Sequence, residues 1–242
     1  MSATLAILTL ALTQGTPNLR DVESPLVAAW VPNAAARCTN PSLHGRMIGG
    51  VAFVTGPEGR PAFNFGGLDG VIAIPDAPDA WLSQSVTVTA WVWVRDFTPH
   101  GSSPAGQIFF RGDDRCGYDP YHLTMLGDGR FEFGIDGESG DRTGVAAFAK
   151  REQWIFLVGS FNAETGAISL FCNGILMART FTTIRPFTAL DKGWHPGLAI
   201  GNTQFPQGGI HWQPFNGYIG EVRLYDTAIE DPLEAGWLGK RN

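Results

Sequence analysis

The sequence predicts an all-β fold, a sandwich of two antiparallel sheets (a jelly roll), and three observations lead to this prediction. The 242 residues include 31 glycines and 16 prolines spread without a period, which is typical of tight turns between many short strands. Short apolar or alternating segments follow one another from Leu26 onward, at the spacing of sandwich strands. Helical periodicity is almost confined to Asp231–Leu238, where Asp231 can cap a short helix. Chains of this length commonly form a single β-sandwich domain, so we expect one domain over residues 16–242.

The clearest strand is Ser85–Arg95, in which apolar and other residues alternate with period two. The apolar positions from Val86 to Val94 share one face, and Trp91 and Trp93 share the other. Because the two tryptophans lie in mid-strand, we expect them to pack on the sheet. Further strands are predicted at Ala62–Phe65, Gly70–Ile74, Gln107–Arg111, His122–Leu126, Arg130–Ile135, Trp154–Phe161, Ala167–Cys172 and Gly217–Tyr225.

Charge and cysteine content exclude several classes of partner and site. The formal net charge is −6, and the 17 Lys and Arg residues are scattered, whereas nucleic-acid binders cluster their basic residues. Nucleic acid is therefore not expected as a partner. Cys38, Cys116 and Cys172 show no Cys-x-x-Cys spacing, which argues against zinc or thioredoxin chemistry. They allow at most one disulfide, and the alternative is buried free thiols.

The first residues resemble a secretory signal. An apolar run at Ala3–Leu12 is followed by small or polar residues up to Gly15, although no basic residue precedes the run. Ten apolar residues are too few to span a bilayer, so the alternative is a buried N-terminal strand. We expect a signal peptide at residues 1–15, no membrane span, and a secreted or extracytoplasmic protein.

Several segments in order resemble the bacterial laminin-G-like members of the concanavalin A-like lectin and glucanase superfamily. The matching segments are Leu26–Trp30, Ala62–Pro75, Val86–Val92, Trp154–Asn162, Ile168–Gly174, Leu198–Asn202 and Phe215–Tyr225. One departure is Gly220, where the family commonly has Asp. The resemblance implies a jelly-roll sandwich and calcium near its rim, and it leaves both binding and hydrolysis open, because the superfamily includes binders and hydrolases.

The catalytic patterns of hydrolases find little support in the sequence. A retaining glycosidase needs two carboxyl groups about 5 Å apart, which laminarinase-like relatives supply from one strand. The nearest candidates here are Glu132, Asp136 and Glu138, and they straddle a predicted turn from Gly134 to Gly140 that would not aim them together. The five histidines lie apart, and no Gly-x-Ser-x-Gly elbow occurs. We therefore expect no catalytic residues.

Aromatic residues in predicted loops are the candidates for ligand binding, because sugar rings stack on exposed aromatic faces. Trp194, His195, His211 and Trp212 lie in a Pro- and Gly-rich stretch from Asp191 to Phe215, between two strands. Tyr118 and Tyr121 offer a second site. The alternative is that these rings pack the loops onto the edge of the sandwich.

Acidic residues in two turns are the candidates for a metal site. Asp113, Asp114 and Asp119 lie within seven residues, and oxygen ligands at this density could hold Ca²⁺. The alternative is a solvated acidic loop in which Arg115 neutralises a neighbouring Asp. Asp69 is a further candidate ligand, with an equal claim to being a turn residue that bonds its own backbone.

These features together favour a non-catalytic extracytoplasmic module that recognises a glycan or a glycosylated surface, with calcium as the expected cofactor. The first alternative is a diverged glycoside hydrolase or polysaccharide lyase of the same superfamily. The second is a structural or protein-adhesion domain that binds no small ligand. The sequence leaves the oligomeric state open.

Overall fold

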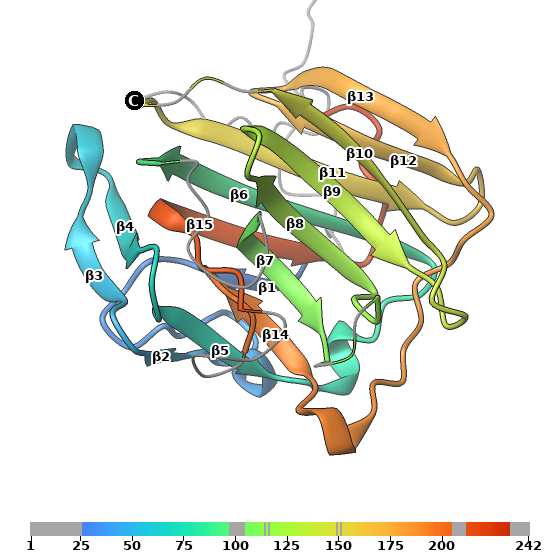
Figure 1. Ribbon diagram of the computed structural model, residues 1–242, viewed down its shortest axis with the longest axis horizontal. Helices are drawn as coiled ribbons and strands as arrows, with labels where there is room; N and C mark the ends of the chain where they lie inside the picture. Colours follow the sequence, from blue (N-terminus) through green and yellow to red (C-terminus); the bar gives the residue numbers. More distant parts are fainter. Residues whose placement is uncertain are drawn as a thin grey trace, which may run out of the picture.

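The predicted β-sandwich is confirmed by the structure, a computed structural model that describes residues 26–96, 105–113, 115, 117–148, 150, 152–204 and 212–232. Two antiparallel sheets stack as two layers (Figure 1). No helix among these residues is long and apolar enough to cross a membrane. Most of the predicted helix at Asp231–Leu238 lies outside the described residues. The predicted signal peptide at residues 1–15 lies wholly outside them.

Sheet A has eight strands, in the order β13-β12-β11-β6-β15-β4-β3, and β1 also pairs with β15. Its strands are β1 (Leu26–Trp30), β3 (Ala52–Thr55), β4 (Pro61–Gly66), β6 (Ser85–Val94), β11 (Ile155–Asn162), β12 (Ala167–Cys172), β13 (Ile175–Phe181) and β15 (Asn216–Tyr225). The antiparallel pairing of β1 with β15 places Leu26 beside Tyr225 and Trp30 beside Val222.

Sheet B has seven strands, in the order β10-β9-β8-β7-β14-β5-β2. They are β2 (Arg46–Ile48), β5 (Val71–Pro75), β7 (Ala105–Gly112), β8 (Tyr121–Leu126), β9 (Arg130–Asp136), β10 (Arg142–Phe148) and β14 (Gly197–Ile200). Four short 3₁₀ turns lie between strands, η1 (Pro41–Leu43), η2 (Pro57–Gly59), η3 (Pro78–Ala80) and η4 (Lys192–Trp194).

The core lies between the two sheets. The alternate burial of side chains along β6 shows which face of sheet A points toward it. Each apolar residue at the alternate positions from Val86 to Val94 is fully buried in the main core cluster, whereas Trp91 and Trp93 are only partly buried. β6 forms hydrogen bonds with β11 on one side and β15 on the other, so it is a central strand of sheet A. Period-two burial is what a strand with one core-facing side requires.

Two features of the core depend on single residues. Gly159 of β11 lies against the ring of Phe133 from sheet B, so closely that a Cβ atom at this position would overlap the ring. Arg111 is fully buried, and its guanidinium pairs with Asp76 at 2.9 Å while it donates to the main-chain oxygens of Phe187 and Thr188. Buried charges are tolerated when they are paired and hydrogen-bonded in this way.

The described cysteines, Cys38 and Cys172, are free thiols and partly buried. Burial raises the pKa of both thiols, that of Cys172 to about 11. Both groups are therefore protonated at neutral pH and are weak nucleophiles. Cys116 lies outside the described residues.

Candidate functional site

The side chains on the outer face of sheet B include a cluster of ionisable groups. On β8, Tyr121 and Leu123 point into the core, so His122 between them points outward. On β9, Phe133 and Ile135 also point into the core. The same alternation places Glu132, Gly134 and Asp136 on the outer face.

This arrangement corrects the sequence prediction for β9. We expected the strand to end at Ile135 with a turn that begins at Gly134, but the strand continues through Asp136 and pairs regularly with β10. Glu132 and Asp136 therefore do share one face of the sheet. The glycine misled the prediction: Gly134 lies in mid-strand because the ring of His122 occupies the space that a side chain would take.

His122 links the acids of this cluster. Its Nε2 lies 3.4 Å from Glu132 Oε1, and the imidazole is almost completely buried. Burial on its own would lower the pKa of His122, but the contact with Glu132 and the nearby carboxylates Asp136 and Asp119 raise it above its ordinary value. The same contact lowers the pKa of Glu132. At mildly acidic pH the pair is therefore a protonated imidazole beside an ionised carboxylate.

Asp119 and Asp136 form a second pair beside it. The main-chain N–H of Asp119 donates to Asp136 Oδ2 at 3.2 Å, and Oδ1 of each residue is buried without a hydrogen-bond partner. Burial raises the pKa of Asp136, and it raises the pKa of Asp119 to about 7. A carboxyl group with one unsatisfied buried oxygen favours its neutral form, so these two residues hold protons more tightly than exposed acids do.

Glu132 and Asp136 do not make the catalytic pair of a retaining glycosidase. The ring of His122 lies over Gly134, which is midway between them in the strand. Asp136 is also fully buried, whereas the two carboxyl groups of such an enzyme must flank one accessible bond. Glu138, the third candidate, follows the strand and is exposed.

Trp194 is exposed, as predicted for a loop aromatic. It ends η4, and 46% of its surface is accessible. The turn is capped by Asp191, whose Oδ1 accepts from the main-chain N–H of Gly193 at 2.8 Å. His195 follows in the left-handed region with φ 53° and is also exposed. The cap orders the backbone of the turn from which the indole projects.

Asp113 connects this turn to the loop that carries Tyr118. It is fully buried, and it accepts from the main-chain N–H of Asp191 at 3.1 Å while it pairs with the guanidinium of Arg115. The guanidinium carbon of Arg115 lies 3.9 Å from the ring centroid of Tyr118. The structure therefore brings Tyr118, Arg115 and Trp194 onto two loops joined through one carboxylate.

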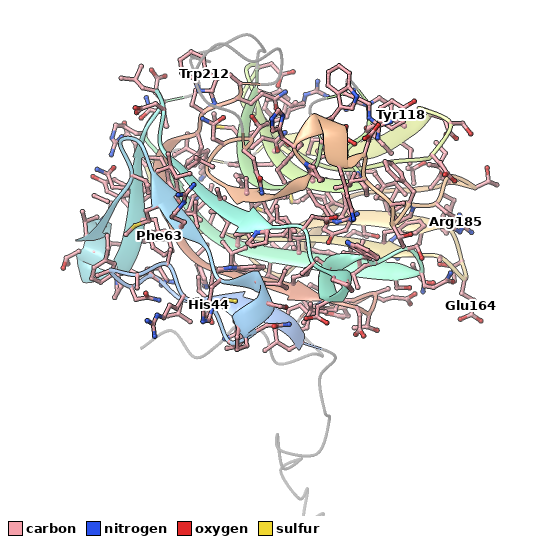
Figure 2. The ribbon with its side chains drawn as sticks, turned by 90° about the horizontal axis from the view of Figure 1, so that it is seen from below. His44, Phe63, Tyr118, Glu164, Arg185 and Trp212 are labelled. Atoms are coloured by element: carbon pink, nitrogen blue, oxygen red, sulfur yellow. The ribbon has the colours of Figure 1, made fainter. Side chains whose placement is uncertain are left out.

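The remaining predicted aromatics differ from one another. Trp212 is partly buried, and it lies on the sheet-B side of the molecule, as Tyr118 does (Figure 2). Tyr121 is fully buried, its hydroxyl donates to the main-chain oxygen of Ala80 at 2.6 Å, and its ring stacks on Phe109. Tyr121 therefore belongs to the core and offers no surface for a ligand. His211 lies outside the described residues.

The predicted calcium ligands do not converge in the part of the chain that the structure describes. Both oxygens of Asp113 are engaged by Arg115, and Oδ1 of Asp69 accepts from the main-chain N–H of Gly50, 19 residues away in the chain, at 3.0 Å. No group of three or more His, Cys, Asp or Glu side chains among the described residues is placed to hold a metal ion. Asp114 lies outside those residues.

Sequence reasoning missed His122 as a member of an outward-facing cluster. The signal was present, because the alternation of Tyr121, Leu123 and Met125 already places His122 on the opposite face of β8. The link from Asp113 to Asp191 gave no such signal, since 78 residues separate the two in the chain.

Comparisons with known proteins agree with the fold. Domain 4 of AbnA, an extracellular GH43 arabinanase from Geobacillus stearothermophilus solved in complex with arabinotriose, is 20% identical, with a TM-score of 0.64 over 90% of this chain and 99% of that chain. The binding domain of botulinum neurotoxin serotype D/C VPI 5993 is 11% identical, with a TM-score of 0.62 over 90% of this chain and 53% of that one. The binding domain of botulinum neurotoxin DC in complex with SialylT has a TM-score of 0.62 at 12% identity, again over 90% of this chain and about half (52%) of that one.

At these identities the likeness shows the fold alone. No curated protein matches the sequence. A laminin G family model, described as concanavalin A-like lectin/glucanases superfamily, matches residues 65–232, which is more than two thirds of the 242 residues. The expected resemblance is thereby confirmed, and the chain belongs to the concanavalin A-like lectin/glucanase superfamily.

Proposed function

We propose that this protein is a non-catalytic carbohydrate-recognition module that works outside the cytoplasm and binds its ligand at the loops on the sheet-B side. The observation that carries the proposal is the exposed indole of Trp194 on its capped turn, joined through Asp113 to the loop of Tyr118 and Arg115. An exposed indole and a phenol ring paired with a guanidinium, on two joined loops, are suited to a sugar.

The chemistry of each group supports this ligand class. A sugar ring presents an apolar C–H face that can stack on an indole or phenol ring, and its hydroxyl groups accept hydrogen bonds from a guanidinium. Because the loops are tied together by buried hydrogen bonds at Asp113, little conformational entropy is lost on binding. Trp212, on the same side of the molecule, extends the proposed surface.

The structural neighbours support a binding role by analogy. The arabinanase domain was solved with arabinotriose, and the toxin domains are named as binding domains. Because function resides in sites rather than in folds, these names suggest the ligand class without specifying the ligand of this chain.

We also propose that calcium assists binding, which can be tested separately. Among the predicted ligands, Asp119 keeps one buried oxygen without a hydrogen-bond partner, and a bound cation would offset the cost of that oxygen. A chelator therefore tests calcium independently of sugar binding.

A glycan array probed with the full chain, with calcium and again with chelator, tests the proposal. Trp194→Ala should weaken binding about tenfold or more, because truncation of a central aromatic anchor commonly costs more than 1 kcal/mol. Trp81→Ala is the matched control, since Trp81 is similarly exposed (40%) but follows the η3 turn, where its indole N–H donates to Asp76; thermal melting checks that this variant stays folded. Equal loss in both variants, or no binding across a broad array, would contradict the proposal and favour a structural or protein-adhesion role.

A further inference from the structure

A pocket of about 280 Å³ opens on the outer face of sheet A, in the layer opposite the loops discussed above. Its lining comes from three turns and one strand: Glu58, Arg60, Trp91, Gln153, Trp154 and Asn173. The volume is slightly below that of pockets for drug-sized ligands, about 300–1,000 Å³. It therefore suits a single small unit rather than a chain.

Arg60 is held in place by the tryptophans beneath it. Its guanidinium carbon lies 4.1 Å from the ring centroid of Trp91 and 5.3 Å from that of Trp154. Trp91 also packs on Phe156 at 5.0 Å, and the indole N–H of Trp154 donates to the main-chain oxygen of Pro57 at 3.0 Å. These contacts fix the guanidinium at the mouth of the pocket, where it is only partly buried.

The guanidinium N–H groups of Arg60 have no hydrogen-bond or ion-pair partner within the described part of the chain. Arg95, on the same sheet face, differs: its guanidinium lies over Tyr218, yet it also donates to Asn64 and Asn216. The guanidinium of Arg60 is thus held in place by two rings while its N–H donors have no acceptor. A guanidinium in this state is suited to a carboxylate, which it can bind through two parallel hydrogen bonds.

The carboxylate of Glu58 restricts which ligands this pocket can bind. It lines the same pocket without pairing with Arg60, and it is held in the left-handed region at φ 55°. A carboxylate repels a small free anion but accepts hydrogen bonds from hydroxyl groups. The amide of Asn173 is oriented by the main-chain N–H of Phe156, which donates to its Oδ1 at 2.9 Å. The lining therefore fits a ligand that carries both a negative group and hydroxyl groups.

We propose that this pocket binds an acidic sugar unit of the uronic-acid class, with its carboxylate on Arg60 and its hydroxyl groups on Glu58 and the neighbouring amides. The site is separate from the proposed loop surface on sheet B and does not depend on it. Strained backbone such as that at Glu58 is concentrated at binding sites, which is consistent with a function at this turn.

The test is an NMR titration of the full chain with methyl glucuronide and, as the matched neutral probe, methyl glucoside. The indole N–H resonance of Trp154 reports on the pocket directly. We expect saturable shifts with the glucuronide at concentrations on the order of millimolar, and at least tenfold weaker binding of the glucoside, which has no carboxylate.

Three variants decide the outcome. Arg60→Gln should weaken glucuronide binding about tenfold or more, and Arg60→Lys should also weaken it, because a lysine keeps the charge but loses the fork. Arg37→Gln removes an exposed arginine elsewhere and should leave binding unchanged. Thermal melting of each variant separates loss of the site from loss of the fold.

The proposal is overturned if the wild-type protein does not bind the glucuronide, if folded Arg60→Gln binds it as tightly as wild type, or if sodium acetate competes as well as the glucuronide. Trp194→Ala should keep glucuronide binding intact. Loss of array binding in that variant, with the sheet-A pocket unaffected, would separate the two proposals from each other.

Discussion

Replacement of Asp119 by asparagine should remove a pH-dependent cost from the folded protein. Burial raises the pKa of Asp119 from an ordinary value of 3.8 to about 7. An acid with a raised folded-state pKa binds its proton more tightly in the folded protein. Its contribution to stability is therefore fully present below the unfolded-state pKa and is lost as the pH rises through the folded-state pKa.

The size of the effect follows from the shift. About three pKa units at ~1.4 kcal/mol each set an upper limit of about 4 kcal/mol between pH 4 and pH 8. Asparagine has the same shape and stays neutral, so Asp119→Asn and wild type should be about equally stable at pH 4 and below, and the difference should grow by up to ~1.4 kcal/mol per pH unit as the pH rises toward 7. At pH 8 the variant should be more stable by roughly 2 to 4 kcal/mol. The raised pKa of His122 adds a slope of the same sign, which is smaller in the variant because Asp119 is one of the carboxylates that raise this pKa.

Urea denaturation followed by tryptophan fluorescence at pH 5, 6, 7 and 8 measures this difference, since the chain has eight tryptophans. Glu138→Gln is the control, because Glu138 is an exposed carboxylate just beyond the same strand and its removal should not change the slope. If wild type and Asp119→Asn differed by a constant amount at all four values of pH, the argument from burial would be wrong.

Three further substitutions test how the core is held. Arg111→Leu should destabilise the fold by about 3–5 kcal/mol in urea denaturation, because it leaves the carboxylate of Asp76 without its partner; a loss below 1 kcal/mol would show that the pair is dispensable. Gly159→Ala should cost about 1–3 kcal/mol, since the new methyl group must displace the ring of Phe133, and an unchanged thermal midpoint would count against this close packing. Trp30→Phe should cost at least about 1 kcal/mol, because the indole N–H of this fully buried residue donates to a buried main-chain oxygen at 3.0 Å, and it should remove the most buried fluorophore from the emission spectrum.

The central strands could be predicted from the sequence because they alternate regularly. β6, β9 and β12 each bury one face against the other sheet, so the period-two pattern is preserved. β10 and β13 were not predicted. Each lies at one edge of its sheet, and large apolar side chains such as Phe148 and Phe181 are exposed on them. A strand without a consistently buried face leaves little alternation in its sequence.

The candidate site was predictable only in part, for a similar reason. Trp194 was identified correctly as a loop residue because Pro and Gly surround it in the sequence, whereas Tyr121 was placed in the same class as Tyr118 although it begins β8. The role of Asp113 depends on Asp191, and that of Arg60 on two tryptophans far along the chain. Local patterns carry no information about such distant pairs.

The pairing of β1 with β15 has a mechanical consequence. Leu26 and Tyr225 lie side by side at one end of this antiparallel pair. A pulling force between these two residues would load the hydrogen bonds one after another, like a zipper, rather than all together in shear. The first strand should therefore peel away at low force, while the rest of sheet A keeps its pairing. Separation of β1 from β15 would therefore release tension in sheet A, the layer opposite the loops on the sheet-B side, and would leave those loops undisturbed.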